Sequence, residues 1–447
     1  MLLTIEKLVY GGDGLARLPA DGSSSDKQGR GKAAFVPFVL EDEKVEARLI
    51  EQKPGFARGI ADRILESSPH RAQPACPYFT RCGGCHYQHA SYEHQLRIKE
   101  AIVRETLRRT AKLELDCPIQ VHPSPPWNYR NRSRLQIRTQ PEFLLGYFKQ
   151  GSQEVLAVDE CPISSTLINR GIAATWRLGR AGKVPEGVNE IELFAKADDS
   201  ALLIEVGCSD AARRAEIRAF AEDLKVAMSE IAGVVVFHQK ASGKAAPEKM
   251  ISVGEEFLNY EARRRAFRVS AGSFFQTNRH LIDELVDIVT KGRSGELAVD
   301  LYAGVGLFST ALRDFRHVVS VEMSQTSTGD LSYNLPSNGE VVQATTEQYL
   351  ARLENSERIG KGRVLPHTFH KPDLAVVDPP RAGLGESVAR LLGKLSASQI
   401  IYVSCDPATL ARDLRILLAA GYGIAQAHLV DMFPQTYHIE SVFMLER

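Results

Sequence analysis

The strongest constraint on the fold lies in the last third of the chain, where short apolar runs alternate with runs of helical periodicity. The expected elements are strands at residues 297–301, 318–321, 374–377 and 400–403, and helices at residues 281–290, 304–312 and 407–420. Strands that alternate with helices predict a parallel sheet with right-handed crossovers. Ligands of such sheets bind at the carboxyl ends of the strands, so residues that follow these strands are the first candidates for a functional site.

The first 70 residues follow a different pattern. Five short runs of β-branched or alternating apolar residues are separated by turn formers such as Gly11-Gly12-Asp13-Gly14. This pattern predicts a small β-barrel. We interpret the polar stretch 21–32 as a solvated hairpin loop and residues 92–113 as an amphipathic helix. Residues 130–260 alternate strand-like and helix-like runs without a recognisable motif.

Composition places the chain among ordinary globular proteins. Its 447 residues are 44% apolar and 25% charged, with 55 Lys and Arg balancing 55 Asp and Glu. The longest charge-free run, residues 416–430, is shorter than the roughly 18 apolar residues of a membrane span. The N-terminus has no positive segment ahead of a long apolar one. We therefore expect a cytoplasmic protein without a membrane partner, and we expect a monomer.

A glycine turn follows the strand at 297–301. Gly304 and Gly306 would let the backbone approach a ligand closely, and Glu322 follows the next strand, where an acid can accept hydrogen bonds from ribose hydroxyls. A dinucleotide site requires a third glycine, and position 309 is Ser. An adenosyl ligand without phosphates, S-adenosylmethionine, is therefore the expected cofactor.

Three further side chains that could take part in catalysis lie near strand ends. Asp378 opens a rigid Asp-Pro-Pro-Arg sequence and should point into the same cleft. Cys405 precedes an expected helix, whose amide end should lower the pKa of the thiol. Glu440 interrupts an otherwise apolar run. The alternatives are a tight strand exit for Asp378, a small core thiol for Cys405 and a solvated strand face for Glu440.

The combination of these motifs closely resembles the RNA uracil-5 methyltransferases. The resemblance rests on five segments, in matching order and spacing: Phe275-Gln-Thr-Asn278, Asp300 to Gly306, Asp378-Pro-Pro-Arg381, Ser404-Cys-Asp-Pro407 with the following Ala408 to Leu414, and His438-Ile-Glu440. It implies a multidomain α/β protein in three parts. These are a TRAM-like, OB-like RNA-binding barrel over residues 1–70, a central α+β domain with an iron-sulfur site and a basic RNA-binding surface over 71–265, and a Rossmann-like methyltransferase domain over 266–447.

The resemblance also assigns roles to residues. Cys405 would attack C6 of uracil, the resulting enolate would take the methyl group at C5, and Glu440 would remove the C5 proton so that Cys405 is expelled. The base would have to be flipped out of its stack or presented from a loop. The family's cofactor-site positions fall on four residues: Gln276, Tyr302, Glu322 and Asp378. Thr326 to Gly329 and Pro336 are poor helix formers, so the helix after Glu322 is expected to be short.

Three closely spaced cysteines indicate a metal site. Cys76, Cys82 and Cys85 lie in a loop rich in Pro and Gly, and a fourth thiolate is needed to complete either a zinc site or an iron-sulfur cluster. Spacing alone does not separate the two. The resemblance supplies Cys161 as the fourth ligand of a [4Fe-4S] cluster. Cys117 and Cys208 are interpreted as ordinary core or surface thiols.

Charge is segregated along the chain in a way that favours RNA as the partner. Residues 58–138 contain 14 Lys and Arg against 7 Asp and Glu. Within them, Tyr129-Arg-Asn-Arg-Ser-Arg134 and Arg138 interleave an aromatic with basic residues, as phosphate contacts and base stacking require. The triplet Arg263-Arg264-Arg265 is a weaker signal of the same kind.

The sequence thus predicts an enzyme that methylates C5 of a uridine in RNA, with 23S ribosomal RNA as the expected substrate and transfer RNA as the alternative. Two other classes remain open. A methyltransferase acting on the amino group of adenine or guanine would need neither Cys405 nor Glu440. A non-catalytic iron-sulfur protein that binds RNA would use only the barrel and the basic stretch.

Overall fold

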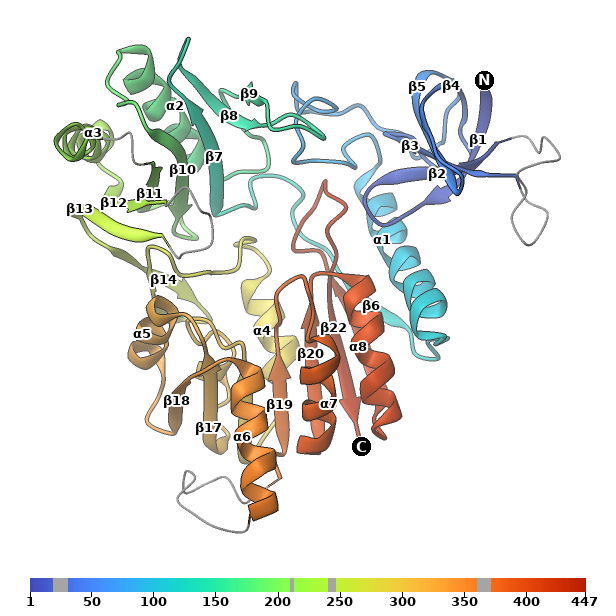
Figure 1. Cartoon of the computed structure of the whole chain (residues 1–447), viewed down its shortest axis with the longest axis vertical. Helices are drawn as coiled ribbons and strands as arrows, with labels where there is room; N and C mark the ends of the chain where they lie inside the picture. Colours follow the sequence, from blue (N-terminus) through green and yellow to red (C-terminus); the bar gives the residue numbers. More distant parts are fainter. Residues whose placement is uncertain (19–30, 210–212, 240–246, 360–370) are drawn as a thin grey trace.

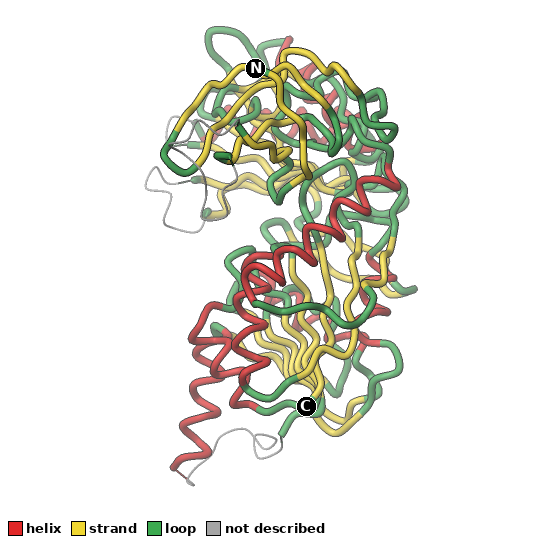
Figure 2. The backbone as a smooth tube through the Cα atoms, turned by 90° about the vertical axis from the view of Figure 1, so that its right-hand side faces the viewer, coloured by secondary structure: helices red, strands yellow, loops and turns green. Residues whose placement is uncertain are grey.

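The computed structural model describes residues 1–18, 31–209, 213–239, 247–359 and 371–447. The barrel and a seven-stranded sheet lie at one end of the long axis, and an eight-stranded sheet lies at the other (Figures 1 and 2). Helix α1 (Tyr92–Thr106) runs between the two ends. Among the described residues, no helix is both long and apolar enough to cross a membrane.

The N-terminal strands close into a barrel in the order β1-β2-β3-β5-β4. Their bounds are β1 Leu2–Leu8, β2 Asp13–Arg17, β3 Ala33–Pro37, β4 Lys44–Gln52 and β5 Phe56–Glu66. Alternating side chains such as Ile5, Val36 and Ala57 fill the interior, so the predicted barrel is confirmed. Most of the expected hairpin loop at 21–32 lies outside the described residues.

The central region is a mixed seven-stranded sheet in the order β13-β12-β11-β10-β7-β8-β9. Its elements are β7 Arg132–Arg138, β8 Leu144–Phe148, β9 Val155–Ala157, α2 Thr166–Arg180, β10 Val188–Ala195, β11 Leu202–Cys208, α3 Arg214–Ala227, β12 Ile231–His238 and β13 Glu248–Gly254. The hairpin of β14 (Phe257–Ala262) and β15 (Arg265–Ser270) leads from it into the last third.

The last third forms the expected doubly wound sheet, in the order β18-β17-β16-β19-β20-β22-β21-β6. Its strands are β6 Ile119–His122, β16 Gly295–Leu301, β17 Phe315–Glu322, β18 Gly339–Gln343, β19 Leu374–Val377, β20 Gln399–Ser404, β21 Gly423–Val430 and β22 Glu440–Glu446. Its helices are α4 Ile282–Thr290, α5 Gln325–Asn334, α6 Thr346–Ile359, α7 Gly385–Leu395 and α8 Pro407–Ala419. Strands β16 to β20 in this sheet run parallel, and β22 runs antiparallel to β20.

The edge strand β6 comes from far upstream and pairs with β21 in parallel register, from Ile119 opposite Ala427 to His122 opposite Val430. The eight-stranded sheet therefore contains a strand from within the range 71–265. The domain boundaries given above stay predictions.

The prediction of a helix at residues 304–312 is wrong. The structure has only a short 3₁₀ turn, Ser309–Ala311, after the glycine turn. The buried carboxylate of Asp300 accepts hydrogen bonds from the backbone N–H and the hydroxyl of Ser309. This contact takes the Ser309 amide out of the helical hydrogen-bond pattern. The helix after Glu322 does form, as the ten residues of α5.

A buried ion pair joins α1 to the eight-stranded sheet. The ammonium of Lys99 lies 2.6 Å from a carboxylate oxygen of Asp431, and both side chains are at most 1% exposed. The Tyr92 hydroxyl donates a second hydrogen bond to the same carboxylate, at 2.9 Å. Replacing one partner leaves the other as an uncompensated buried charge.

Lys99→Met should therefore lower the free energy of unfolding by about 3 to 5 kcal/mol, measured by urea denaturation. Lys44→Met is the matched control, because the Lys44–Glu66 pair is solvent-exposed and should contribute at most about 1 kcal/mol. Equal effects of the two substitutions would contradict this view of Lys99.

Candidate active site

The strand ends bring the predicted catalytic residues to one edge of the eight-stranded sheet. Asp378 follows β19, and Cys405 follows β20. Glu440 begins β22, and the antiparallel pairing of Ser441 with Ser404 brings it to the same edge. The amide of the buried Gln276 donates to a carboxylate oxygen of Asp378 at 3.4 Å. Residues separated by 164 positions in the sequence, Gln276 to Glu440, thus meet in one place.

The two acids of this edge are buried and favour their protonated forms. Burial, with a further contribution from Asp300, raises the pKa of Asp378 to about 7. Burial and the neighbouring Asp378 raise the pKa of Glu440 well above its usual range. The alternative in which Glu440 lies on a solvated strand face is wrong, because only 4% of the residue is exposed.

The expected lowering of the Cys405 pKa is also wrong. Burial, followed by the nearby Glu440 and Asp378, raises the pKa of this thiol to about 12. The amide end of α8 is already satisfied, because the carboxylate of Asp406 accepts from the backbone N–H groups of Ala408 and Thr409. The helix terminus therefore stabilises the Asp406 carboxylate instead of a Cys405 thiolate.

Arg381 is the cation that opposes this accumulation of acids. Its positive charge lowers the pKa of both Cys405 and Glu440, although burial outweighs it. One of its guanidinium nitrogens lies 3.3 Å from Nε2 of His438. Burial and Arg381 lower the pKa of His438 to about 3, so the ring is neutral. Sequence reasoning placed both residues inside motifs without giving them a role, although a cation after two prolines at a strand end was an available signal.

The glycine turn and Glu322 form a second feature of the same edge. Glu322 accepts hydrogen bonds from the backbone N–H of Gly304 at 2.9 Å and of Ser324 at 2.6 Å. Tyr302 and Gly304 both have positive φ angles, of 68° and 56°, which turn the chain sharply at the end of β16. No atom lies within 4 Å of where a Cβ on Gly304 would be, so the turn borders open space. Such an opening beside a carboxylate suits a polar ligand.

All four predicted metal-ligating cysteines line one cavity of about 50 Å³. Burial raises the pKa of Cys82 to about 11 and that of Cys85 further. Arg130 lines the same cavity, and its buried Nε has no hydrogen-bond partner. Within the described part of the chain, no three His, Cys, Asp or Glu side chains converge closely enough to hold one metal ion. The thiols therefore surround a space without meeting at a point.

The predicted stacking surface around Tyr129 is wrong in part. Tyr129 is fully buried, and its hydroxyl donates to the carbonyl of Pro434. Arg132 is buried against the ring of Phe194 and pairs with Glu192. Alternation in a strand places one face inward, so Arg134 and Arg138 are exposed, whereas Arg132 is buried. Arg130, just before the strand, is half-buried. The triplet Arg263 to Arg265 lines a separate groove of about 630 Å³ with Arg313.

Comparison with known proteins places these features in a family. Residues 91–447 match the tRNA (uracil-5-)-methyltransferase family, and residues 1–61 match the TRAM domain. The chain is 32% identical to an uncharacterized RNA methyltransferase of Aquifex aeolicus over 99% of this chain and 98% of the relative. It is 30% identical to the 23S rRNA (uracil(1939)-C(5))-methyltransferase RlmD of Shewanella amazonensis, over 93% of this chain and 91% of the relative.

A solved structure has the same fold. The Pyrococcus abyssi tRNA (uracil-54, C5)-methyltransferase, in complex with S-adenosyl-L-homocysteine, superposes with a TM-score of 0.72 at 23% identity, and each chain is covered completely. The doubly wound sheet with its TRAM barrel is therefore the fold of a methyltransferase. The chain belongs to the tRNA (uracil-5-)-methyltransferase family, as its motifs predicted. Its class is that of the RNA uracil-5 methyltransferases.

The thiol pKa gives a test that needs no substrate. Because the thiolate is the reactive form, alkylation of Cys405 by iodoacetamide should accelerate about tenfold per pH unit from pH 7 and keep rising beyond pH 10. Arg381→Met should slow the reaction at each pH in this range, since it removes the favourable charge. Mass spectrometry of the Cys405 peptide measures the rate. A plateau below pH 9 would instead support the lowered pKa expected from the sequence.

Proposed function

We propose that the protein transfers the methyl group of S-adenosylmethionine to C5 of a uridine in RNA through a covalent bond between Cys405 and C6 of uracil. The observation that carries this proposal is the meeting of a thiol, Cys405, with a buried carboxyl, Glu440, and a cation, Arg381. Uracil C5 is a poor carbon nucleophile, and a thiolate that adds to C6 supplies the missing electron density. An amino-group methyltransferase has no need for this thiol and acid.

The steps follow from the residues present. Cys405 first loses its proton to solvent and then adds to C6 as the thiolate, whose negative charge the guanidinium of Arg381 stabilises. The enolate then forms the new carbon–carbon bond at C5 as the bond between sulfur and methyl breaks. Glu440 takes the C5 proton as the carboxylate, a form that the positive charge of Arg381 favours, the double bond between C5 and C6 re-forms, and Cys405 leaves as the thiolate. Burial favours the protonated form of Glu440 after that transfer.

The methyl donor is proposed to bind along the edge formed by Gln276, Tyr302, Glu322 and Asp378. Glu322 is held by the Gly304 and Ser324 amides with its carboxylate beside the open turn, which suits a ribose hydroxyl donor. The hydrogen bond from Gln276 fixes the Asp378 carboxyl. A sulfonium cation near Asp378 would favour the carboxylate form of that buried acid.

Ribosomal RNA is the proposed substrate. The relative named for 23S ribosomal RNA matches this chain over 93% of its length at 30% identity, which supports this choice over transfer RNA. The test is to map 5-methyluridine in the ribosomal and transfer RNA of a strain from which the gene is deleted. Loss of the modification from 23S RNA is expected. Its loss from transfer RNA alone would instead identify transfer RNA as the substrate.

The four cysteines are proposed to hold a [4Fe-4S] cluster that folds the surrounding region. A zinc ion held by these four cysteines would need each thiolate about 2.3 Å from one point, and the described cysteines do not converge in this way. A cluster of several atoms takes its thiolates at separate corners, as a cavity lined by all four cysteines allows. The unpartnered Nε of Arg130 fits an anionic group in that cavity.

The order of steps predicts different outcomes for the two catalytic residues. Glu440→Gln should still attack and methylate uracil but should not release it, so a denaturation-resistant complex of protein and RNA should accumulate. Cys405→Ala should form no complex and no 5-methyluridine, while RNA binding persists. Gel electrophoresis after denaturation measures the complex. Ordinary turnover by Glu440→Gln would make Asp378 the first alternative base.

Glu322→Ala tests the proposed donor site. Loss of the charged acceptor should weaken S-adenosylmethionine binding by about 1.5 to 3 kcal/mol, measured by isothermal titration calorimetry. Glu296→Ala is a control, because Glu296 is exposed at the opposite end of β16. Unchanged affinity of Glu322→Ala would remove this residue from the site.

Metal analysis tests the cluster. Anaerobically purified protein should be brown and should contain about four irons per chain. Cys161→Ser should lose iron, whereas Cys117→Ser, outside the cavity, should keep it. Colourless protein with one zinc ion per chain would contradict the proposal.

A further inference from the structure

The loop between β21 and β22, residues 431–439, leads directly into the active site. His438 contacts Arg381 from this loop, and Glu440 follows it immediately. A residue that fixes the loop therefore acts on His438, which contacts Arg381, and on Glu440, which lies near Cys405.

The centre of the loop is Gln435, which is buried and has a positive φ of 69°. A residue other than glycine adopts this left-handed conformation only when its surroundings impose it. Four hydrogen bonds do so, and none comes from the eight-stranded sheet. The backbone N–H of Gln435 donates to Oε1 of Gln95 at 3.0 Å. Its side-chain Oε1 accepts from Nε2 of Gln95, also at 3.0 Å.

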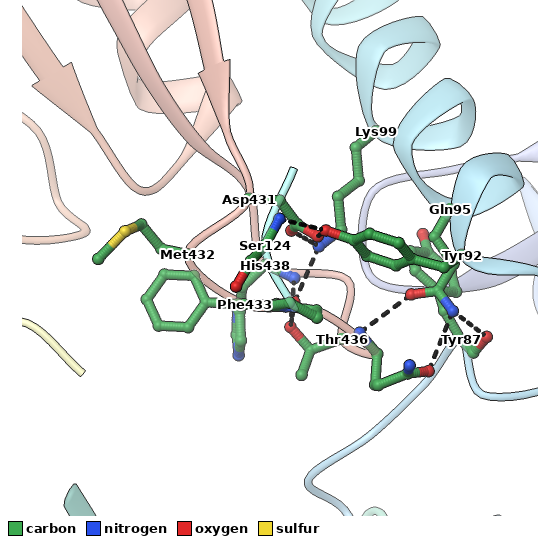
Figure 3. A network of polar contacts seen from close by, with 12 residues as sticks. Tyr87, Tyr92, Gln95, Lys99, Ser124, Asp431, Met432, Phe433, Thr436 and His438 are labelled. Carbon is green, nitrogen blue, oxygen red and sulfur yellow. Dashed lines mark hydrogen bonds and ion pairs between the residues drawn. The ribbon is translucent and has the colours of Figure 1, made fainter. Parts of the chain in front are cut away.

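The remaining two bonds come from the segment that follows Cys85. The carbonyl of Gln435 accepts from the backbone N–H groups of His86 at 2.8 Å and Tyr87 at 2.9 Å. Gln95 fixes this segment too, since its Nε2 also donates to the carbonyls of Tyr87 at 3.1 Å and Ala90 at 3.0 Å. The side chain of Gln95, which is 1% exposed, thus holds the loop and the cysteine-bearing segment together (Figure 3).

Neighbouring contacts anchor the rest of the loop from the same side. Lys99, one turn after Gln95 on α1, pairs with Asp431 and donates to the carbonyl of Phe433 at 2.9 Å. The hydroxyl of Tyr129 donates to the carbonyl of Pro434 at 3.1 Å. Tyr129 precedes Arg130, which lines the cysteine cavity. The loop is therefore held by segments that also surround that cavity.

We propose that Gln95 is a positioning residue of the active site, which holds residues 431–439 in their working conformation through Gln435 and so places His438 against Arg381 and Glu440 near Cys405. The inference rests on the proposed function. Gln95 touches neither substrate nor donor in this account. Its loss removes the partner of the Gln435 N–H and the Gln95 bonds to the Gln435 side-chain oxygen and the Ala90 carbonyl, whereas the Tyr87 carbonyl keeps the N–H of Ala90. The strained turn at Gln435 then relaxes.

The test compares Gln95→Leu with two matched variants in the full-length protein. Gln399→Leu removes a glutamine whose side chain donates to the exposed Glu446, far from the loop. Gln435→Gly keeps the backbone bonds and removes the strain of the positive φ, so it should lose far less activity than Gln95→Leu. Gln95→Glu, which keeps the acceptor for the Gln435 N–H and loses the donors, should be intermediate and serves if Gln95→Leu does not fold.

Three measurements distinguish positioning from general destabilisation. In Gln95→Leu, kcat should fall between about 10-fold and 100-fold, while the affinity for S-adenosylmethionine measured by calorimetry stays within about twofold. Hydrogen exchange should accelerate in residues 431–439 and stay unchanged in the barrel. Wild-type kcat and exchange in Gln95→Leu would overturn the proposal, and so would a parallel loss of donor affinity and of protection throughout the chain. If the wild-type protein forms no 5-methyluridine, the proposed function has failed, and loop exchange alone then decides this inference.

Discussion

The buried ion pair of Lys99 and Asp431 is the interaction on which the arrangement of the molecule depends. An ammonium taken out of water must find a negative partner, and the nearest one lies at the end of β21, 332 residues away in the sequence. The pair fixes α1 against the eight-stranded sheet, and β6 adds an edge strand to that sheet from the same part of the chain. The region that precedes the catalytic sheet is therefore part of its framework. The loop that brings His438 to Arg381 depends on that framework for its anchors.

The second organising constraint is the excess of buried acid at the carboxyl edge. Asp300 and Asp378 both have pKa values raised to about 7, and burial raises the pKa of Glu440 well above its usual range. In this environment the free protein keeps Cys405 as a thiol at neutral pH. The proposed methyl donor carries a positive sulfonium, which would add to the effect of Arg381 and favour the thiolate. Reactivity at Cys405 would then arise only with the donor in place, which protects the thiol from other electrophiles.

Sequence patterns predicted the parts of this structure that depend on local order. Continuous apolar runs located β19 and β20, and the geometry of parallel sheets then placed Asp378 and Cys405 at one edge. Local sequence patterns do not show how deeply a side chain is buried or which distant segment a strand pairs with. They missed β6, whose four residues find their partner about 300 positions away, and they reversed the direction of the Cys405 pKa shift. They also predicted an exposed, base-stacking Tyr129, whereas the structure buries this residue against the loop 431–439.

The covalent role of Cys405 is the central claim, and peptide mapping of a trapped complex tests it most directly. RNA containing 5-fluorouridine at the target should trap the unmodified enzyme, because fluorine cannot leave C5 as a proton does. After digestion, the peptide joined to the pyrimidine should contain Cys405, and the mass of the adduct should include the transferred methyl group. A linkage to any other residue, or release of the RNA on denaturation, would contradict the account.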